Sequence, residues 1–300
     1  MSLQKNAKLK QKIIAAVEEL RESYRADVCV TAYSKEENRK AYMIAYYPYF
    51  FLAADIVVVD LLKDYLGERL KSQKKLYCEY FAGGPCPELF GTAAAVNGFA
   101  KKNNLGEVSL DAVIYDSQDN WSNLVFTVSV RMPTEVNFCK GFDIQKTAQK
   151  LSEIYKTPPT SDYWKNIKAR LANTDVVFLQ NYLSHISPSP QSVRNFLVWF
   201  AQLVRLTPYG TTFVLIDLKY GATYRVFDHL QSDNFLSQTD LIVLDEFSHT
   251  PQNHDDALTI WHPLPSEGIK ENIFYDPETE SSTLKRKTNY FKLVLLKAQP

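Results

Sequence analysis

The chain has 300 residues, of which 45% are hydrophobic and 23% are charged, a composition typical of a globular protein. Lysine and arginine together number 34, as do aspartate and glutamate, so the formal net charge is zero. This balance argues against a protein that holds nucleic acid mainly through bulk positive charge, although it leaves room for a local basic patch.

Cysteine usage and linker composition indicate the compartment and the domain organisation. The four cysteines contain no Cys-x-x-Cys pair and follow no secretory leader, so we expect reduced thiols in a cytoplasmic protein. No segment rich in Pro, Gly and Ser divides the chain. We therefore predict a helical extension over residues 1–72 and one larger domain over 73–300, in which 249–287 is a surface insertion.

The first 72 residues read as helices. Residues 4–26 carry Leu9, Ile13, Val17 and Leu20 at helical spacing, which predicts an amphipathic helix. The segment 41–62 is apolar enough to suggest a membrane span, but it contains a proline and two aspartates. Each aspartate would cost roughly 2.5–3.5 kcal/mol at the centre of a membrane helix. We therefore expect a buried helical pair and no membrane contact, with a further helix over 56–70.

Tyrosines are concentrated in this extension. Tyr42, Tyr46 and Tyr49 fall on one helical face, up to the break expected before Pro48. One interpretation is that these rings pack on the domain. Another is that Arg39, Tyr46 and Tyr47 form a lid over a ligand.

A strand, a glycine turn and a helix follow in immediate succession. Residues 76–81 are an apolar run of strand length, and Gly83-Gly84-Pro85 breaks it, because glycine tolerates backbone angles and close approaches that side chains forbid. A helix is predicted to begin at Pro87, with Glu88 complementing its positive end. Free backbone N–H groups at such a helix start are suited to a nucleotide-type ligand.

The rest of the chain alternates strands with helices. Strands are expected over 108–115, 137–142, 175–180, 211–216, 241–244 and 290–296, and helices over 119–130, 146–155, 162–172, 190–206 and 224–235. This alternation predicts an α/β fold with a mostly parallel, doubly wound sheet. Ligands of such sheets lie outside the carboxyl ends of the strands, where Asp116, Asp143 and Gln180-Asn181-Tyr182 follow their strands.

At these residues the chain resembles the class I S-adenosylmethionine-dependent methyltransferases, a superfamily with a Rossmann-like fold. The resemblance covers residues 76–300 and includes the glycine motif after Glu79, Tyr115-Asp116, Gly141-Phe142-Asp143 and the strand 175–182. It implies a seven-stranded sheet with an antiparallel last strand. It also implies that S-adenosylmethionine lies over the glycine turn, with its ribose on Asp116 and its adenine near Asp143. The implied cofactor-binding residues are Glu79, Ala82, Gly83, Gly84, Pro85, Asp116, Ser117, Trp121, Asp143, Ile144, Gln180 and Asn181.

No residue pattern identifies a general base or the methyl acceptor. Tyr182 and His185 are the candidates for substrate contact or proton transfer. The polar segment with His249, His254, Asp255, Asp256 and His262 could be read as metal ligands, but a solvated surface is the favoured interpretation and no metal site is predicted. The neutral net charge favours a small molecule or a protein over RNA as the acceptor.

The predicted function is therefore methyl transfer from S-adenosylmethionine to an unidentified acceptor. Two alternatives remain open at this point. One is a non-catalytic protein that has the same fold and binds the cofactor or a partner through the tyrosine-rich extension. The other is a nicotinamide-dependent oxidoreductase, because a glycine turn before a helix also serves dinucleotides.

Overall fold

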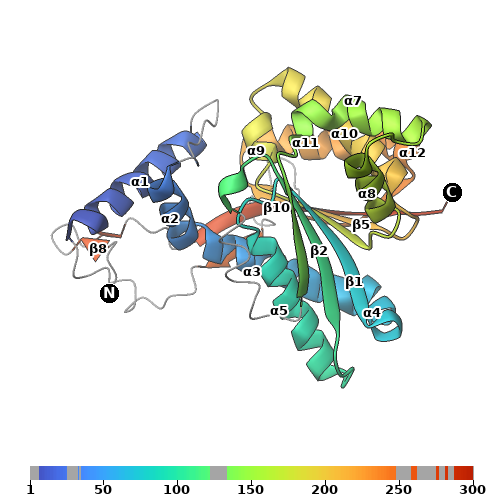
Figure 1. The fold of residues 1–300 in the computed structure, drawn as a ribbon. Coiled ribbons are helices and arrows are strands. Elements are labelled where there is room, and N and C mark those ends of the chain that lie inside the picture. The colour runs from blue at the N-terminus through green and yellow to red at the C-terminus, as the bar shows by residue number, and fades with distance from the viewer. Residues whose placement is uncertain are drawn as a thin grey trace.

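The computed structural model of the chain describes residues 7–25, 33, 35–121, 134–247, 258–261, 275–276, 281–282 and 287–299. These residues form a central β-sheet with helices on both faces, and the first helices extend to one side (Figure 1). The predicted α/β class is thereby confirmed.

The N-terminal helices are α1 (Ala7–Arg25), α2 (Glu36–Ala45), α3 (Tyr47–Leu61) and α4 (Gly67–Gln73). Pro48 lies in the first turn of α3, where its missing N–H costs nothing. Between α3 and α4 runs a π-helical turn, η2 (Leu62–Leu66). The single helix predicted over 56–70 is therefore wrong in detail, because this turn interrupts it.

The sheet has the strand order β3-β2-β1-β4-β5-β10-β6. Its strands are β1 (Lys75–Phe81), β2 (Ser109–Asp116), β3 (Thr134–Lys140), β4 (Val176–Gln180), β5 (Thr212–Leu218), β6 (Leu241–Phe247) and β10 (Lys287–Lys297). The first five are mutually parallel, and β10 runs antiparallel to β5 and β6. The predicted antiparallel last strand is thus confirmed.

Two further features lie outside the seven predicted strands. A short strand, β7 (Leu258–Trp261), pairs antiparallel with the beginning of β10, which makes eight strands in the described part of the sheet. It comes from the segment predicted as a surface insertion. The pair β8 (Tyr275–Asp276) and β9 (Ser281–Ser282) forms a separate small sheet.

Two apolar cores lie on opposite faces of the sheet. One contains α3 and α5 (Pro87–Lys102), and the other contains α7 (Ile144–Lys156), α8 (Asp162–Leu171), α10 (Pro190–Leu206), α11 (Gly221–Leu230) and α12 (Asp233–Thr239). Every residue of β4 and β5 is buried, as expected for parallel strands covered on both faces. The single helix predicted over 224–235 is two helices, because the Ser232 side chain caps a new start at α12.

The apolar segment 41–62 packs inside the protein. The buried face of α3 includes Phe50, Ala54 and Val58, and α3 lies along α5. Among the described helices, none alone has the length and apolarity to cross a membrane; only the bent pair Glu36–Ala45 and Tyr47–Gln73, with 48° between its halves, meets those criteria together.

The close approach of α3 and α5 depends on a glycine. A Cβ at Gly91 would lie 2.4 Å from the Phe51 carbonyl oxygen, whereas a Cβ at Gly98, one turn before the end of the same helix, would have no atom within 4 Å. We expect Gly91→Ala to lower the free energy of unfolding by about 1–3 kcal/mol through overpacking. Gly98→Ala should raise it by up to about 1 kcal/mol through helix propensity.

Urea denaturation followed by circular dichroism measures both changes. Equal effects of the two substitutions would contradict the close contact at Gly91.

Candidate functional site

The glycine turn after β1 has a backbone that few side chains allow. Ala82, Gly84 and Cys86 all have positive φ angles, of 54°, 54° and 53°. The Cys86 N–H donates to the Gly83 carbonyl over 2.7 Å, and α5 begins immediately afterwards at Pro87, as predicted. Non-glycine residues in this region are strained, and such strain is concentrated at functional sites.

Gly83 sits where a side chain would not fit. A Cβ there would lie 3.0 Å from the Ile114 side chain and 3.3 Å from the Cys86 sulfur. Glycine at this position lets the turn lie close against β2.

Asp116 ends β2 and holds the glycine turn in place. Its Oδ2 accepts from the Gly84 N–H at 2.8 Å, and its Oδ1 accepts from the Gln118 N–H at 2.7 Å. The carboxylate therefore ties the ends of β1 and β2 together. A carboxylate is an acceptor with about four lone-pair sites, and this one lies at the strand end beside the turn.

The end of β4 contributes the polar residues Gln180 and Asn181. The Gln180 side-chain amide donates to the Phe50 carbonyl of α3 at 3.0 Å, and both residues are more than nine-tenths buried. Asn181 has a φ of 56°, which places a third strained non-glycine residue at this edge of the sheet.

Tyr182 and His185 follow in the loop and in α9 (Leu183–Ile186). The Tyr182 hydroxyl accepts from the Gln145 side-chain amide at 2.9 Å, and burial raises the pKa of Tyr182. Burial lowers the pKa of His185 to about 4, so the imidazole is neutral at pH 7.

These strand ends enclose one cavity of about 250 Å³. Most of the residues predicted for the site line it, namely Ala82, Gly83, Gly84, Pro85, Asp116, Ser117, Trp121, Gln180, Asn181, Tyr182 and His185. The structure thus brings together segments that are up to about a hundred residues apart, as the rule for parallel sheets leads one to expect.

Three predicted residues lie elsewhere. Glu79 does not line the cavity. Its buried carboxylate forms an ion pair with Arg170 of α8. Burial raises the pKa of Glu79 to about 7, and the Arg170 charge opposes that rise. Asp143 caps α7 by accepting from the Gln145 N–H at 2.9 Å, and Ile144 is buried in the core beneath α7. The structure therefore gives these three residues structural contacts in place of the expected cavity position.

Four cavity residues were not predicted as site residues: Tyr33, Tyr42, Glu88 and Gln118. Glu88 lies in the first turn of α5, where its charge suggests only a partner for the helix dipole. In the structure it is 2% exposed, its Oε1 has no partner within the described residues, and burial raises its pKa to about 8.

Three aromatic rings line the cavity and contact one another, and we call them the aromatic roof: Tyr33, Tyr42 and Trp121. Their ring centroids are 5.3 Å apart for Tyr33 and Trp121, and 5.7 Å apart for each of the other two pairs. The roof joins the N-terminal extension to η3 (Asp119–Trp121), which follows β2. Arg39, Tyr46 and Tyr47, which form the lid in the alternative interpretation, are not among the lining residues.

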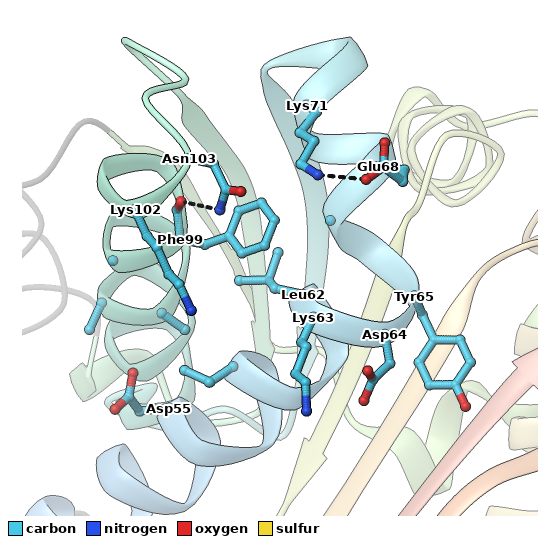
Figure 2. Close-up of a pocket in the computed structure, with 15 residues that line it drawn as sticks. Asp55, Leu62, Lys63, Asp64, Tyr65, Glu68, Lys71, Phe99, Lys102 and Asn103 are labelled. Carbon is cyan, nitrogen blue, oxygen red and sulfur yellow. Dashed lines mark hydrogen bonds and ion pairs between the residues drawn. The ribbon is translucent and has the colours of Figure 1, made fainter.

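A second cavity, of about 530 Å³, lies between the α3–η2–α4 segment and the second half of α5 (Figure 2). Lys63, Phe99 and Lys102 are among its lining residues, and the Asn103 side chain donates to the Phe99 carbonyl beside it. It is larger than the first cavity, but all of its lining residues come from these helices and the turns that end them. It therefore lies away from the carboxyl ends of the strands.

The histidines and aspartates considered as metal ligands lie outside the described residues. Within the described part of the chain, no group of three or more His, Cys, Asp or Glu side chains is arranged to hold a metal ion.

The chain is similar to known proteins in its structure and not in its sequence. No family model matches the sequence, and neither does any curated protein. Similar solved structures include a protein from Listeria monocytogenes assigned provisionally as a class I S-adenosylmethionine-dependent methyltransferase. That chain is 12% identical, the match covers 97% of this chain and 88% of that one, and the TM-score is 0.45.

Two other solved structures have similar sequence identities and TM-scores. Loganic acid methyltransferase with SAH is 12% identical over 85% of this chain and 94% of its own, with a TM-score of 0.44. The CMeT domain of the citrinin polyketide synthase is 12% identical over 96% of this chain and 66% of its own, with a TM-score of 0.47.

Proposed function

We propose that the protein is an S-adenosylmethionine-dependent methyltransferase. The observation that carries this proposal is the convergence of the glycine turn, Asp116 and Gln180-Asn181 on one cavity. They lie at the carboxyl ends of the adjacent parallel strands β1, β2 and β4. In an open α/β sheet this edge is where a nucleoside-bearing ligand binds.

The residues present fit such a ligand. The turn at Gly83 and Gly84 allows close approach of its backbone, and the Asp116 carboxylate lines the same cavity, where an acceptor suits a ribose diol. Trp121 faces Gly84 across the turn and offers a ring for an adenine to pack against. When bound, S-adenosylmethionine supplies a methyl group on a positively charged sulfur.

The protein's own contribution is then positioning and exclusion of water. The aromatic roof gives the cavity an apolar lining, and Asn181 and Tyr182 place polar groups at the end of β4. His185 stays neutral at pH 7, and a pKa of about 4 makes it a weak base. We therefore assign His185 and Tyr182 to substrate contact through hydrogen bonds.

Several finer expectations belong to the same proposal. Residues 1–72 act as a helical cap, which Tyr33 and Tyr42 support by lining the cavity. The acceptor is a small molecule or a protein, which the zero net charge favours over RNA. The cysteine usage supports a cytoplasmic location.

Calorimetric titration with S-adenosylmethionine, S-adenosylhomocysteine and NAD tests the proposal. We expect saturable one-to-one binding of the first two and no detectable binding of NAD, because NAD carries a second nucleotide and the cavity measures only about 250 Å³. Binding of NAD alone would favour the oxidoreductase alternative. Absence of binding by both adenosyl ligands would contradict the proposed function.

A further inference from the structure

Three buried oxygen atoms of the cavity-lining side chains lack a hydrogen-bond partner among the described residues. They are Oε1 of Glu88, Oε1 of Gln180 and Oδ1 of Asn181. Each of the three residues is less than a tenth exposed. Each buried acceptor without a partner costs free energy, so three around one cavity favour a ligand that brings hydrogen-bond donors.

The charges of the groups near the Glu88 carboxylate indicate which kind of hydrogen-bond donor it can bind. The titratable groups that face its carboxylate are the Cys86 thiol, whose hydrogen bond lowers the pKa of Glu88, the Asp116 carboxylate, and the hydroxyls of Tyr42 and Tyr47. None of these described neighbours is a cation, and Asp116 raises the cost of ionising Glu88 further. A buried carboxylate is favourable only when a positive charge pairs with it.

The number of unpartnered acceptors further limits which chemical group can bind here. A primary ammonium group carries three N–H donors and one positive charge, which matches one carboxylate oxygen and two amide oxygens. A hydroxyl group would satisfy only one of the three acceptors and would leave the carboxylate unpaired. The glycine turn borders the same space, because a Cβ at Gly83 would lie 3.5 Å from Glu88 Oε1.

We propose that Glu88, Gln180 and Asn181 form a binding site for a primary ammonium group. This inference rests on the proposed function, under which the group is the amino group of the cofactor's methionine part. It moves that contact from Glu79, which is paired with Arg170, to a carboxylate of the following helix.

The test compares two ligands that differ in the amino-acid part. S-adenosylhomocysteine carries the ammonium group, and 5′-methylthioadenosine carries the same nucleoside without the amino-acid end. Calorimetry should show that Glu88→Gln weakens S-adenosylhomocysteine binding at least tenfold and changes methylthioadenosine binding less than twofold. Glu107→Gln, a substitution of the same chemistry at an exposed position, should change neither.

Retention of the fold in the Glu88→Gln variant is checked by its melting temperature. Glutamine has the shape of the protonated carboxyl group, and burial raises the pKa of Glu88 to about 8. The unfolded state releases this proton at lower pH than the folded state, so the Glu88 carboxyl lowers stability progressively between its ordinary pKa of 4.5 and about 8. We expect the variant's melting temperature at pH 8 to equal or exceed that of the wild type.

Each result of the binding measurements either supports or overturns the proposed ammonium site. Equal weakening of both ligands in a folded Glu88→Gln variant, or no weakening of either, would overturn it while leaving the proposed function intact. Failure of the wild type to bind S-adenosylhomocysteine would overturn the proposed function and this inference with it. Selective loss of S-adenosylhomocysteine supports both.

Discussion

Replacing Asp116 by alanine is expected to weaken S-adenosylhomocysteine binding about 100-fold or more. The substitution removes the acceptor for two ribose hydroxyls, and hydrogen bonds to charged groups contribute about 1.5–3 kcal/mol each. It also releases the Gly84 and Gln118 N–H groups that the carboxylate now holds. Since about 1.4 kcal/mol corresponds to a factor of ten, losing two such bonds accounts for the expected change.

Calorimetry measures this effect, and two variants serve as comparisons. Asp116→Asn keeps one acceptor oxygen and should lose less affinity than Asp116→Ala. Asp162→Ala removes a carboxylate whose side chain is 90% exposed on α8, so it should leave binding unchanged. An Asp116→Ala variant that binds as tightly as the wild type would refute the ribose assignment.

The largest effect on stability is expected from Arg170→Met. The Arg170 guanidinium binds the Glu79 carboxylate through Nε, and it also contacts the side chain and carbonyl of Asp111. Removing the cation leaves Glu79 buried without its partner. Breaking a buried ion pair in this way typically costs about 3–5 kcal/mol.

The loss should depend on pH in a defined direction. The folded-state pKa of Glu79 is about 7, above its ordinary value of 4.5, so ionised Glu79 destabilises the fold as pH rises through 7. Loss of the Arg170 charge raises this pKa further. The deficit of Arg170→Met should therefore be greater at about pH 8 than at about pH 5.

Urea denaturation at the two pH values measures this difference. The double variant Glu79→Gln/Arg170→Met should recover part of the lost stability, because it removes the unpaired carboxylate. Arg205→Met, at an exposed position on α10, provides the matched loss of a cation and should change stability by less than about 1 kcal/mol. A deficit independent of pH would show that Glu79 is not the group left unpaired.

The positions of the strands along the chain and the glycine turn could be predicted because they depend on local patterns. Apolar runs of strand length, the break at Gly83-Gly84 and the start of α5 at Pro87 all appear in the structure within a few residues of their predicted positions. The rule for parallel sheets alone was enough to predict that the polar residues ending β2 and β4 lie close together.

The direction of Glu79 could not be predicted, for a physical reason. A parallel strand covered on both faces has few polar positions to mark which face is which, and a shift of one residue reverses the side of every side chain. The partner that settles the matter, Arg170, is 91 residues away. Glu88 was not predicted as a site residue, because the dipole at a helix start already explains an acidic residue there. Only its burial in the structure indicates a further role.

The aromatic roof has a kinetic consequence for a ligand that reaches the cavity by parting its rings. Each contact between two rings contributes about 0.5–1.5 kcal/mol, so a path that separates all three pairs carries a barrier of about 1.5–4.5 kcal/mol. Entry would then be slower than for an exposed cleft by about ten-fold to a thousand-fold, at 1.4 kcal/mol per factor of ten. Departure would be slowed by the same barrier, so the roof lengthens the residence time of a bound ligand without requiring tighter equilibrium binding.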